Sequence, residues 1–225
     1  QVGRVRSGLA ELFALPEGVP AGRAVLAANM ETALNIVWDA NLRPGDRVVV
    51  IGCGVVGALV GYLAARIPGT EVCLVDLDGG RASLAHQLGC DFALPEAAPG
   101  EADVVVHASA STAGLALAVS LAGTEANIVE ASWYGSGATE VPLGGRFHQR
   151  RLRLVSSQVG RIPPDQAARW TYRRRLEKAL SLLVDPALDA LISGETPFSK
   201  LAERYGTILR DPGTLCHRVR YEEDD

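Results

Sequence analysis

Short runs of β-branched residues alternate with helical segments from Asp46 onward, and this alternation constrains the fold more than any other feature. The runs RVVVIG at 47–52 and EVCLVD at 71–76 are continuously apolar. Such runs are typical of central strands in a parallel sheet, because helices cover both faces of those strands. The pattern predicts an α/β fold with a mostly parallel sheet and right-handed crossovers. The expected strands are Arg47–Gly52, Glu71–Asp76, Cys90–Leu94, Asp103–Ser109, Ala126–Ser132 and Arg151–Gln158.

Less regular segments flank this alternation on both sides. Leu12–Pro20 is predicted to form a short strand that runs into a turn, and Ala21–Leu42 one helix or two abutting helices. Asp165 is a good N-cap for a single helix that ends at about Leu183. Three further elements complete the expected order: a strand over Leu188–Ser193, a helix over Ser199–Arg210 and a strand over Leu215–Tyr221.

These patterns divide the chain into three parts. Residues 1–42 form an N-terminal arm and a linker helix, residues 43–160 a sheet-and-helix core, and residues 161–225 the C-terminal helices with a returning strand. The acidic end, Glu222–Asp225, is expected to be frayed.

Composition and charge exclude several classes of protein. The 225 residues are 48% hydrophobic, which is too apolar for a disordered tail, and the four cysteines form no CxxC pair. With a net charge of −4 the chain carries no global positive field for nucleic acid or an anionic membrane. Neither a signal peptide nor an apolar stretch of membrane-spanning length is recognisable. We therefore expect a cytoplasmic protein that binds neither nucleic acid nor membrane.

The sharpest motif is a glycine triplet at the end of the first expected strand. Gly52, Gly54 and Gly57 give the spacing G-x-G-x-x-G, with a β-branched strand before it and a helix after it. The triplet alone is a weak signal, and the strand–turn–helix context makes it specific. In that context the first glycine permits a tight turn, the second lets backbone approach a pyrophosphate, and the third lets helix and strand pack closely. The motif predicts a dinucleotide-binding loop.

An acidic residue at the end of the second expected strand completes this motif. Asp76 lies where a carboxylate takes the hydroxyls of the adenosine ribose. No Arg or Lys follows it directly to neutralise a 2′-phosphate, since the next residues are Leu77 and Asp78. The sequence therefore favours NAD over NADP.

Two other interpretations of the glycine loop stay open. In the first, the loop serves packing alone and Asp76 is a solvated strand end. S-adenosylmethionine-dependent methyltransferases also place a glycine loop after their first strand, but they usually carry an acidic residue two positions before the first glycine. Val50 occupies that place here.

The order of these motifs resembles the cofactor domain of the medium-chain dehydrogenase/reductase family, the relatives of zinc alcohol dehydrogenase. The resemblance rests on the PGD turn at 44–46, the glycine loop, VDLD at 75–78, RASLAHQLG at 81–89 and DVVVHAS at 103–109. It implies a Rossmann-type doubly wound sheet of six parallel strands, with helices on both faces and short N- and C-terminal arms. By this resemblance the NAD-binding residues are Gly52, Gly54, Val55, Val56, Gly57, Asp76, Arg81 and Ser109.

The resemblance does not extend to the zinc chemistry of the family. Its members carry a GroES-like β domain that supplies a Cys and a His-Glu pair as zinc ligands, and no His-Glu dipeptide occurs in this chain. Ala27 and Ala28 stand at or next to the place of a further family ligand. We therefore expect no zinc in this chain, and the catalytic residues stay unknown. The resemblance also implies a homodimer that pairs its sheets edge to edge through Arg151–Gln158, with the Val2–Leu15 arm and the Leu215–Tyr221 strand near the cleft.

Other residues that carry chemistry have two interpretations each. His107 ends the fourth strand and is either a proton relay or a hydrogen-bonded strand-end histidine. Asn29 and Glu31 open the linker helix, where they reach substrate or serve N-cap and first-turn roles. The cluster Arg173–Arg175 is either an RNA contact or a solvated helix face, and the acidic total favours the second. Cys216 and His217 are adjacent on a strand, so their side chains point to opposite faces and hold no metal together.

These observations imply an NAD-dependent oxidoreductase that transfers hydride between nicotinamide and an alcohol or carbonyl substrate. The alternative is a non-catalytic dinucleotide-binding module or partner subunit without a catalytic domain of its own. The sequence does not name the substrate.

Overall fold

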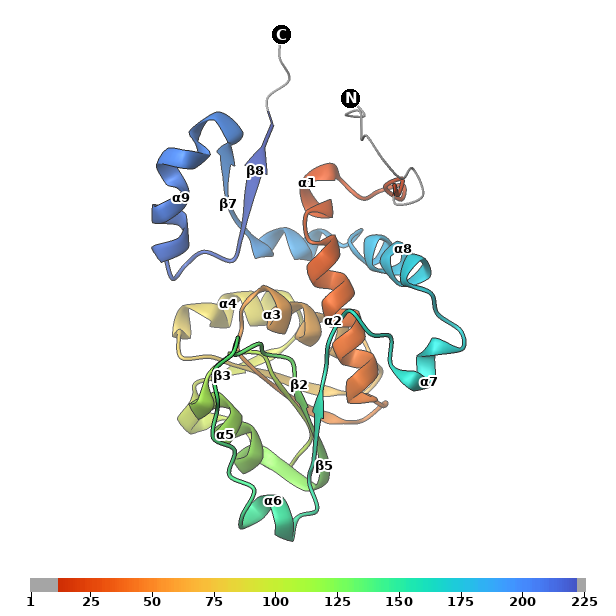
Figure 1. Cartoon of the computed structure of the whole chain (residues 1–225), viewed down its shortest axis with the longest axis vertical. Helices are drawn as coiled ribbons and strands as arrows, with labels where there is room; N and C mark the ends of the chain where they lie inside the picture. The colour runs from red at the N-terminus through yellow and green to blue at the C-terminus, as the bar shows by residue number, and fades with distance from the viewer. Residues whose placement is uncertain (1–11, 222–225) are drawn as a thin grey trace.

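A computed structural model describes residues 12–221 of the chain. Its centre is a six-stranded parallel sheet in the order β3-β2-β1-β4-β5-β6 (Figure 1). The predicted α/β class and the Rossmann-type doubly wound sheet are confirmed. The strands are β1 Arg47–Ile51, β2 Glu71–Val75, β3 Asp91–Ala93, β4 Ala102–His107, β5 Ala122–Glu130 and β6 Arg153–Ser156.

Helices cover both faces of this sheet and bury two separate apolar cores. Alternate residues of β1 point to opposite faces, so Val48 and Val50 enter one core while Val49 and Ile51 enter the other. The first core packs under α2 (Ala27–Ala40), α3 (Val55–Ala64) and α4 (Ala82–Gln87), and the second under α5 (Thr112–Leu121) (Figure 1). The continuously apolar strands are thus explained, because each strand is covered on both sides.

The N-terminal and C-terminal segments meet against the first core. The short helix α1 (Ala21–Ala24) and α2 lie beside α8 (Tyr172–Leu182), and Leu180 and Leu183 are buried with residues of α2. The Arg23 guanidinium donates to Asp189 and to the carbonyl oxygens of residues 183 and 184. These contacts fasten the chain before the sheet to the chain that follows it.

A small lobe lies beside the sheet at the C-terminal end of the chain. It consists of the parallel pair β7 (Ile192–Pro197) and β8 (Cys216–Arg220), with α9 (Leu201–Arg210) between them in sequence (Figure 1). The predicted returning strand over Leu215–Tyr221 is confirmed as β8, and its partner is β7. No residue of α9 is fully buried, so this lobe has little core of its own.

Two predicted strands are wrong, and turn chemistry explains both. Leu12–Pro20 forms no strand, because the chain turns where the Val19 N–H donates to the Pro16 carbonyl and Gly18 adopts a φ of 81°. Most of Leu188–Ser193 lies in the 3-10 helix η4 (Pro186–Leu191), and β7 begins only at Ile192. The Asp185 carboxylate caps η4, which buries Leu188 and Leu191 three positions apart.

The expected helix from Asp165 to about Leu183 is two helices. The first, α7, covers Pro164–Ala167 with Pro163 at its N-cap, so Asp165 lies inside it and the predicted N-cap is wrong. Thr171 is extended and its hydroxyl caps α8 by accepting from the Arg174 N–H. Between the two helices the Trp170 ring lies 4.7 Å from that of Trp38 on α2. Packing of that indole and a strong cap outweigh the helical pattern of the sequence.

The remaining differences are boundaries. Strand β5 begins at Ala122 instead of Ala126, because Ala122 pairs with Ala102 across a register shift next to Glu125, whose φ is 62°. The Ala21–Leu42 segment forms two abutting helices, one of the two predicted forms. Across residues 12–221, no helix is long and apolar enough to cross a membrane. The expected fraying of residues 222–225 and most of the Val2–Leu15 arm lie outside the described residues.

Candidate functional site

The strand order places the site at one edge of the sheet. From the neighbouring strands β1 and β4, the chain continues to β2 and β3 on one side of the sheet and to β5 and β6 on the other. The helices that follow β1 and β4, α3 and α5, lie on opposite faces. The loops after these two strands therefore separate and leave a crevice at their carboxyl ends. This is the place where open α/β sheets bind ligands.

The glycine loop has the geometry that its spacing predicts. Gly52 adopts a φ of 103°, and a Cβ there would lie 2.9 Å from backbone of Ala108 and Ser109. A Cβ on Gly57 would lie 1.9 Å from the Gly52 carbonyl oxygen, so only glycine lets α3 approach the turn this closely. Gly54, the N-cap of α3, faces open space. Val55 and Val56 follow it as the first residues of α3, whose first N–H groups have no partner within the helix.

The Asp76 carboxylate is bonded to this loop. Its Oδ2 accepts from the Cys53 N–H at 2.7 Å, and its Oδ1 accepts from the Asp78 N–H at 3.0 Å. Each carboxylate oxygen accepts more than one hydrogen bond, so both retain capacity toward the crevice. The two halves of the sequence motif therefore form one unit, in which the Asp76 carboxylate is bonded to the loop and also lines the cavity described next.

A cavity of about 580 Å³ lies at this edge. The loop after β1 and the end of β2 form one wall, and the loop after β4 and the start of α5 form another. Its lining is mostly apolar, which suits a flat ring system, and a few polar groups stand at defined points. The lining residues are Ile51, Gly52, Gly54, Val75, Asp76, Leu77, Pro95, Ala108, Ser109, Ser111, Ala113, Gly114 and Leu117.

A buried polar network ends at the same cavity. His107 is fully buried; its Nδ1 lies 2.8 Å from Glu130 Oε2 and its Nε2 lies 2.7 Å from Ser109 Oγ. Ser109 Oγ in turn lies 2.9 Å from Ser111 Oγ. The interpretation of His107 as a hydrogen-bonded strand-end residue is confirmed. Sequence reasoning missed Glu130 and Ser111, although a lone acid that follows the buried pair Ile128–Val129 at a strand end is a detectable signal.

Glu130 carries the charge of this network. Burial raises the pKa of its carboxyl group, but hydrogen bonds from His107 and from the Ser132 backbone N–H outweigh that effect, and the pKa lies below its usual value. The Tyr134 hydroxyl also donates to Glu130 Oε2 at 3.2 Å. Burial, followed by the charge of Glu130 and this hydrogen bond, raises the pKa of Tyr134 to about 12. Near neutral pH the network therefore contains an ionised carboxylate and a neutral phenol.

Arg81 lies at the far end of the site and is already engaged. Its guanidinium donates to the Pro212 carbonyl oxygen at 2.7 Å and lies 3.4 Å from Asp78. Its side chain is mostly covered and is absent from the lining of the 580 Å³ cavity. The structure thus brings the three glycines, Asp76 and Ser109 together, and it leaves Arg81 beside that group.

Several other expectations are corrected by the structure. Arg175 is no part of a solvated face: its side chain is 3% exposed and bonds Glu31, Asn35 and the Val159 carbonyl oxygen. Glu31 is thereby engaged in an ion pair, and neither it nor Asn29 caps α2, whose N-cap is Leu26. In this core a cation is held by a carboxylate and an amide, as a buried charge requires.

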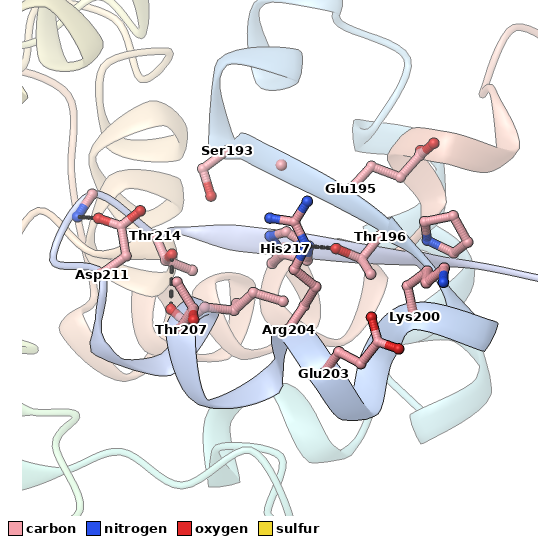
Figure 2. Close-up of a pocket in the computed structure, with 14 residues that line it drawn as sticks. Ser193, Glu195, Thr196, Lys200, Glu203, Arg204, Thr207, Asp211, Thr214 and His217 are labelled. Atoms are coloured by element: carbon pink, nitrogen blue, oxygen red, sulfur yellow. Dashed lines mark hydrogen bonds between the residues drawn. The ribbon is translucent and has the colours of Figure 1, made fainter.

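A second cavity of about 610 Å³ lies in the small lobe, between β7, β8 and α9 (Figure 2). Its lining is polar and carries charges of both signs, among them Lys200 at the N-cap of α9 and Glu203 and Arg204 on α9. His217 Nε2 lies 2.8 Å from the hydroxyl of Thr196 across the strand pair. This cavity shares no lining residue with the first.

Comparison with known sequences gives distant relatives of one kind. The chain is 28% identical over 212 residues to D-guloside 3-dehydrogenase of Escherichia coli K12, with 87% of this chain and 60% of the relative aligned. It is 24% identical over 206 residues to rat sorbitol dehydrogenase, with 89% and 57% aligned. The chain thus spans about 60% of the length of these relatives. No family model matches it.

Solved structures share the fold. L-idonate 5-dehydrogenase from Escherichia coli aligns with a TM-score of 0.78 at 18% identity, over 93% of this chain and 60% of that one. An Escherichia coli alcohol dehydrogenase in complex with NADH has a TM-score of 0.73 at 20% identity, over 91% and 60%. A Sinorhizobium meliloti protein with bound NADP has a TM-score of 0.70 at 19% identity, over 93% and 61%.

The six-stranded doubly wound sheet, with its glycine turn at the strand-order switch, defines a Rossmann-type α/β fold. The relatives found by sequence are dehydrogenases at 24–28% identity. The chain therefore resembles the cofactor domain of the medium-chain dehydrogenase/reductase family in its fold and in the kind of protein to which it is similar.

Proposed function

We propose that this chain binds NAD(H) and serves as the cofactor-binding part of an oxidoreductase that acts on an alcohol or carbonyl substrate. The observation that carries the proposal is the joined unit of glycine loop and acid, in which the Cys53 N–H donates to Asp76 beside an open Gly54. The space at Gly54 is where backbone meets a pyrophosphate in dinucleotide sites. The dehydrogenase relatives support the redox class.

The choice of NAD over NADP rests on charge. Asp76 stands where a 2′-phosphate would be placed, and like charges repel. Arg81, which follows Asp76 in the sequence, does not offset this charge freely, because its guanidinium is held by Asp78 and the Pro212 carbonyl oxygen. Since related structures contain either NADH or NADP, the preference has to come from these residues.

The chain's own residues bind and orient the cofactor. The N-terminal N–H groups of α3, together with its macrodipole, favour the negative pyrophosphate. Asp76 accepts sugar hydroxyls, and the apolar wall that includes Leu77, Pro95 and Leu117 covers the base and excludes water. When bound, a nicotinamide supplies hydride transfer.

Titration with NADH and NADPH, followed by fluorescence, tests this proposal. NADH is expected to bind more tightly, and Asp76→Ala is expected to narrow the difference between the two cofactors. Asp103→Ala is a matched control, because this carboxylate bonds the Arg47 N–H at the opposite end of β1. Tighter binding of NADPH to the wild-type chain contradicts the assignment.

We further propose a homodimer through the edge strand β6, as the family resemblance implies. All four residues of β6 are exposed, including the apolar Leu154 and Val155, and an uncovered edge offers unpaired backbone groups. A two-fold axis there gives a closed, self-complementary contact. Light scattering is expected to give twice 23.7 kDa. A monomeric chain whose Val155→Pro variant is equally monomeric and stable rejects the dimer.

Measurements of bound metal and of catalytic activity distinguish an enzyme from the alternative, a non-catalytic partner subunit. We expect metal analysis of the purified chain to give well under one equivalent of zinc. Oxidation of a polyol by the chain alone, with reduction of NAD, would favour the enzyme. Cofactor binding without turnover would favour the partner subunit.

A further inference from the structure

The network of Glu130, His107 and Ser109 fixes the direction of its hydrogen bonds. The carboxylate of Glu130 is ionised, so it only accepts, and the facing Nδ1 of His107 carries a hydrogen. With a hydrogen on Nδ1 alone, the other ring nitrogen is an acceptor and takes the hydroxyl hydrogen of Ser109 at 2.7 Å. Ser109 Oγ has no second hydrogen to give.

The neighbouring Ser111 adds to the same polarity. Its Oγ accepts from the Gly114 N–H at 3.0 Å, and its hydroxyl hydrogen is free to donate to Ser109 Oγ at 2.9 Å. Ser109 Oγ therefore retains one lone pair, and Ser109 is one of the residues that line the cavity. A ligand in the cavity would thus find Ser109 Oγ as a hydrogen-bond acceptor, which is held in place by His107 and Glu130 inside the sheet.

The structure makes room for this chain of groups. A Cβ on Gly114 would lie 2.4 Å from Ser109 Oγ and 2.6 Å from His107 Nε2, so a side chain at this first turn of α5 would displace both. The backbone N of Ser109 also lies 2.9 Å from the position of a Cβ on Gly52. The acceptor is therefore next to the glycine turn, opposite Asp76, where the sugar and phosphate parts of a nucleotide lie in the proposed function.

We propose that Glu130 and His107 are positioning residues that fix Ser109 Oγ as a hydrogen-bond acceptor for a sugar hydroxyl of the bound nucleotide. This inference rests on the proposed function, because it assigns a second recognition point in the same cavity. Asp76 receives the sugar from the side of β2 and Ser109 from the side of β4. Together they select a ribonucleotide over a deoxyribonucleotide.

Calorimetric titration of the full chain with ADP, 2′-deoxy-ADP and 3′-deoxy-ADP tests this assignment. For the wild type we expect one of the deoxy ligands to bind about three- to tenfold more weakly than ADP because one hydrogen bond is lost. Ser109→Ala should weaken the binding of ADP by a similar factor and reduce that preference to the part that Asp76 supplies, whereas Ser109→Thr, which keeps the hydroxyl, should retain it in full. Ser120→Ala, an exposed serine at the far end of α5, is the matched control.

The positioning role has its own readout. Glu130→Gln does not alter a group that lines the cavity, yet it should reduce the preference for ADP over the deoxy ligand. A purely structural role would weaken both ligands equally. Nitrogen NMR of labelled histidine is expected to show a hydrogen on Nδ1 and none on Nε2 of His107, and it does not depend on any ligand.

The outcomes separate this inference from the proposed function. No binding of ADP or NADH by the wild type rejects the proposed function. Binding with an unchanged deoxy preference in Ser109→Ala rejects the role of Ser109. A hydrogen on both ring nitrogens of His107 rejects the fixed polarity, because Ser109 would then be a donor. If Ser109→Ala changes the difference in affinity between ADP and inosine diphosphate, Ser109 Oγ contacts the base, and the sugar contact is rejected.

Discussion

The edge of the six-stranded sheet and the C-terminal lobe both enclose cavities of similar volume, about 580 and 610 Å³, but they are built differently. The first has a mostly apolar lining backed by fully buried strands, with a buried histidine behind it. The second has a polar lining over a two-stranded sheet, under a helix without a fully buried residue (Figure 2). Volume alone therefore does not mark a site.

The difference lies in what stands behind each wall. The central strands are covered on both faces, so the groups at their ends are held in place by the whole sheet. Such support lets His107 and Glu130 stay fully bonded away from water, where a missing partner is costly. In the described part of the lobe, α9 has no buried residue and the charged side chains that line the cavity are exposed, although Thr196 is buried. Substitutions should therefore have unequal effects in the two regions.

Removal of a buried cation is expected to have the largest effect. Arg175→Ala leaves Glu31 and Asn35 without their partner inside the core, at a cost of about 3–5 kcal/mol of unfolding free energy. Arg220→Ala in the lobe removes an exposed partner of Glu195, at a cost of less than about 1 kcal/mol. Urea unfolding measures both. Equal costs would mean that the lobe is as well buried as the core.

Two helical glycines give the next largest contrast. Gly57→Ala in α3 places a Cβ 1.9 Å from the Gly52 carbonyl oxygen, so the helix and the turn must separate, and a loss of about 3 kcal/mol is expected. Gly206→Ala in α9 meets only the flexible end of Arg210 at 3.2 Å. There a gain of about 0.5 kcal/mol is expected from helix propensity. Thermal unfolding measures both variants. Equal changes in their unfolding temperatures would contradict the proposed difference between the sheet and the lobe.

Alkaline pH should act mainly on the sheet. Burial raises the pKa of Cys53 and Cys90 to about 12 and that of Cys73 to about 11. Because these folded-state pKa values are raised, the stability from the neutral thiols is complete below pH 9 and is lost as the pH rises toward 11–12. At pH 10 the loss is about 1 kcal/mol for each thiol. Denaturant unfolding at pH 8 and pH 10 measures it.

A Cys→Ala variant at these three positions is the control, and its stability should depend less on pH over the same range. Cys216 in the lobe is only half-buried, so a thiol reagent is expected to modify it first in the native chain. Faster modification of Cys53 would contradict the tight packing of the glycine loop.

A small effect on stability, and none on cofactor binding, is expected in the second cavity. Thr196→Val removes the hydroxyl that bonds His217 Nε2 and should cost about 1 kcal/mol. Binding of NADH should not change, since neither residue lines the first cavity. Parallel unfolding and fluorescence titrations check the two statements. A large loss of NADH binding would show that the two regions are coupled.

Elements with a strong local signal were predictable, and those that depend on distant contacts were not. The order of six strands and the glycine turn follow from β-branched runs and from residues with special backbone geometry. The break between α7 and α8 escaped prediction because Trp170 packs on Trp38, far away in the sequence. The helix η4 was mistaken for a strand because its i, i+3 burial spacing is short and its cap, Asp185, lies outside the apolar run.

The sequence by itself determined the α/β class, the glycine loop and the place of Asp76, because each depends on residue type and spacing over a few tens of residues. Only the tertiary structure decided where the charges go. Arg175 and Glu31 are 144 positions apart and meet in the core, and Glu130 meets His107 because β4 and β5 are neighbours. An unpaired charge or hydrogen-bonding group inside a protein is costly, so such groups are buried only with a partner. Because these partners are far apart in the sequence, only the fold brings them together.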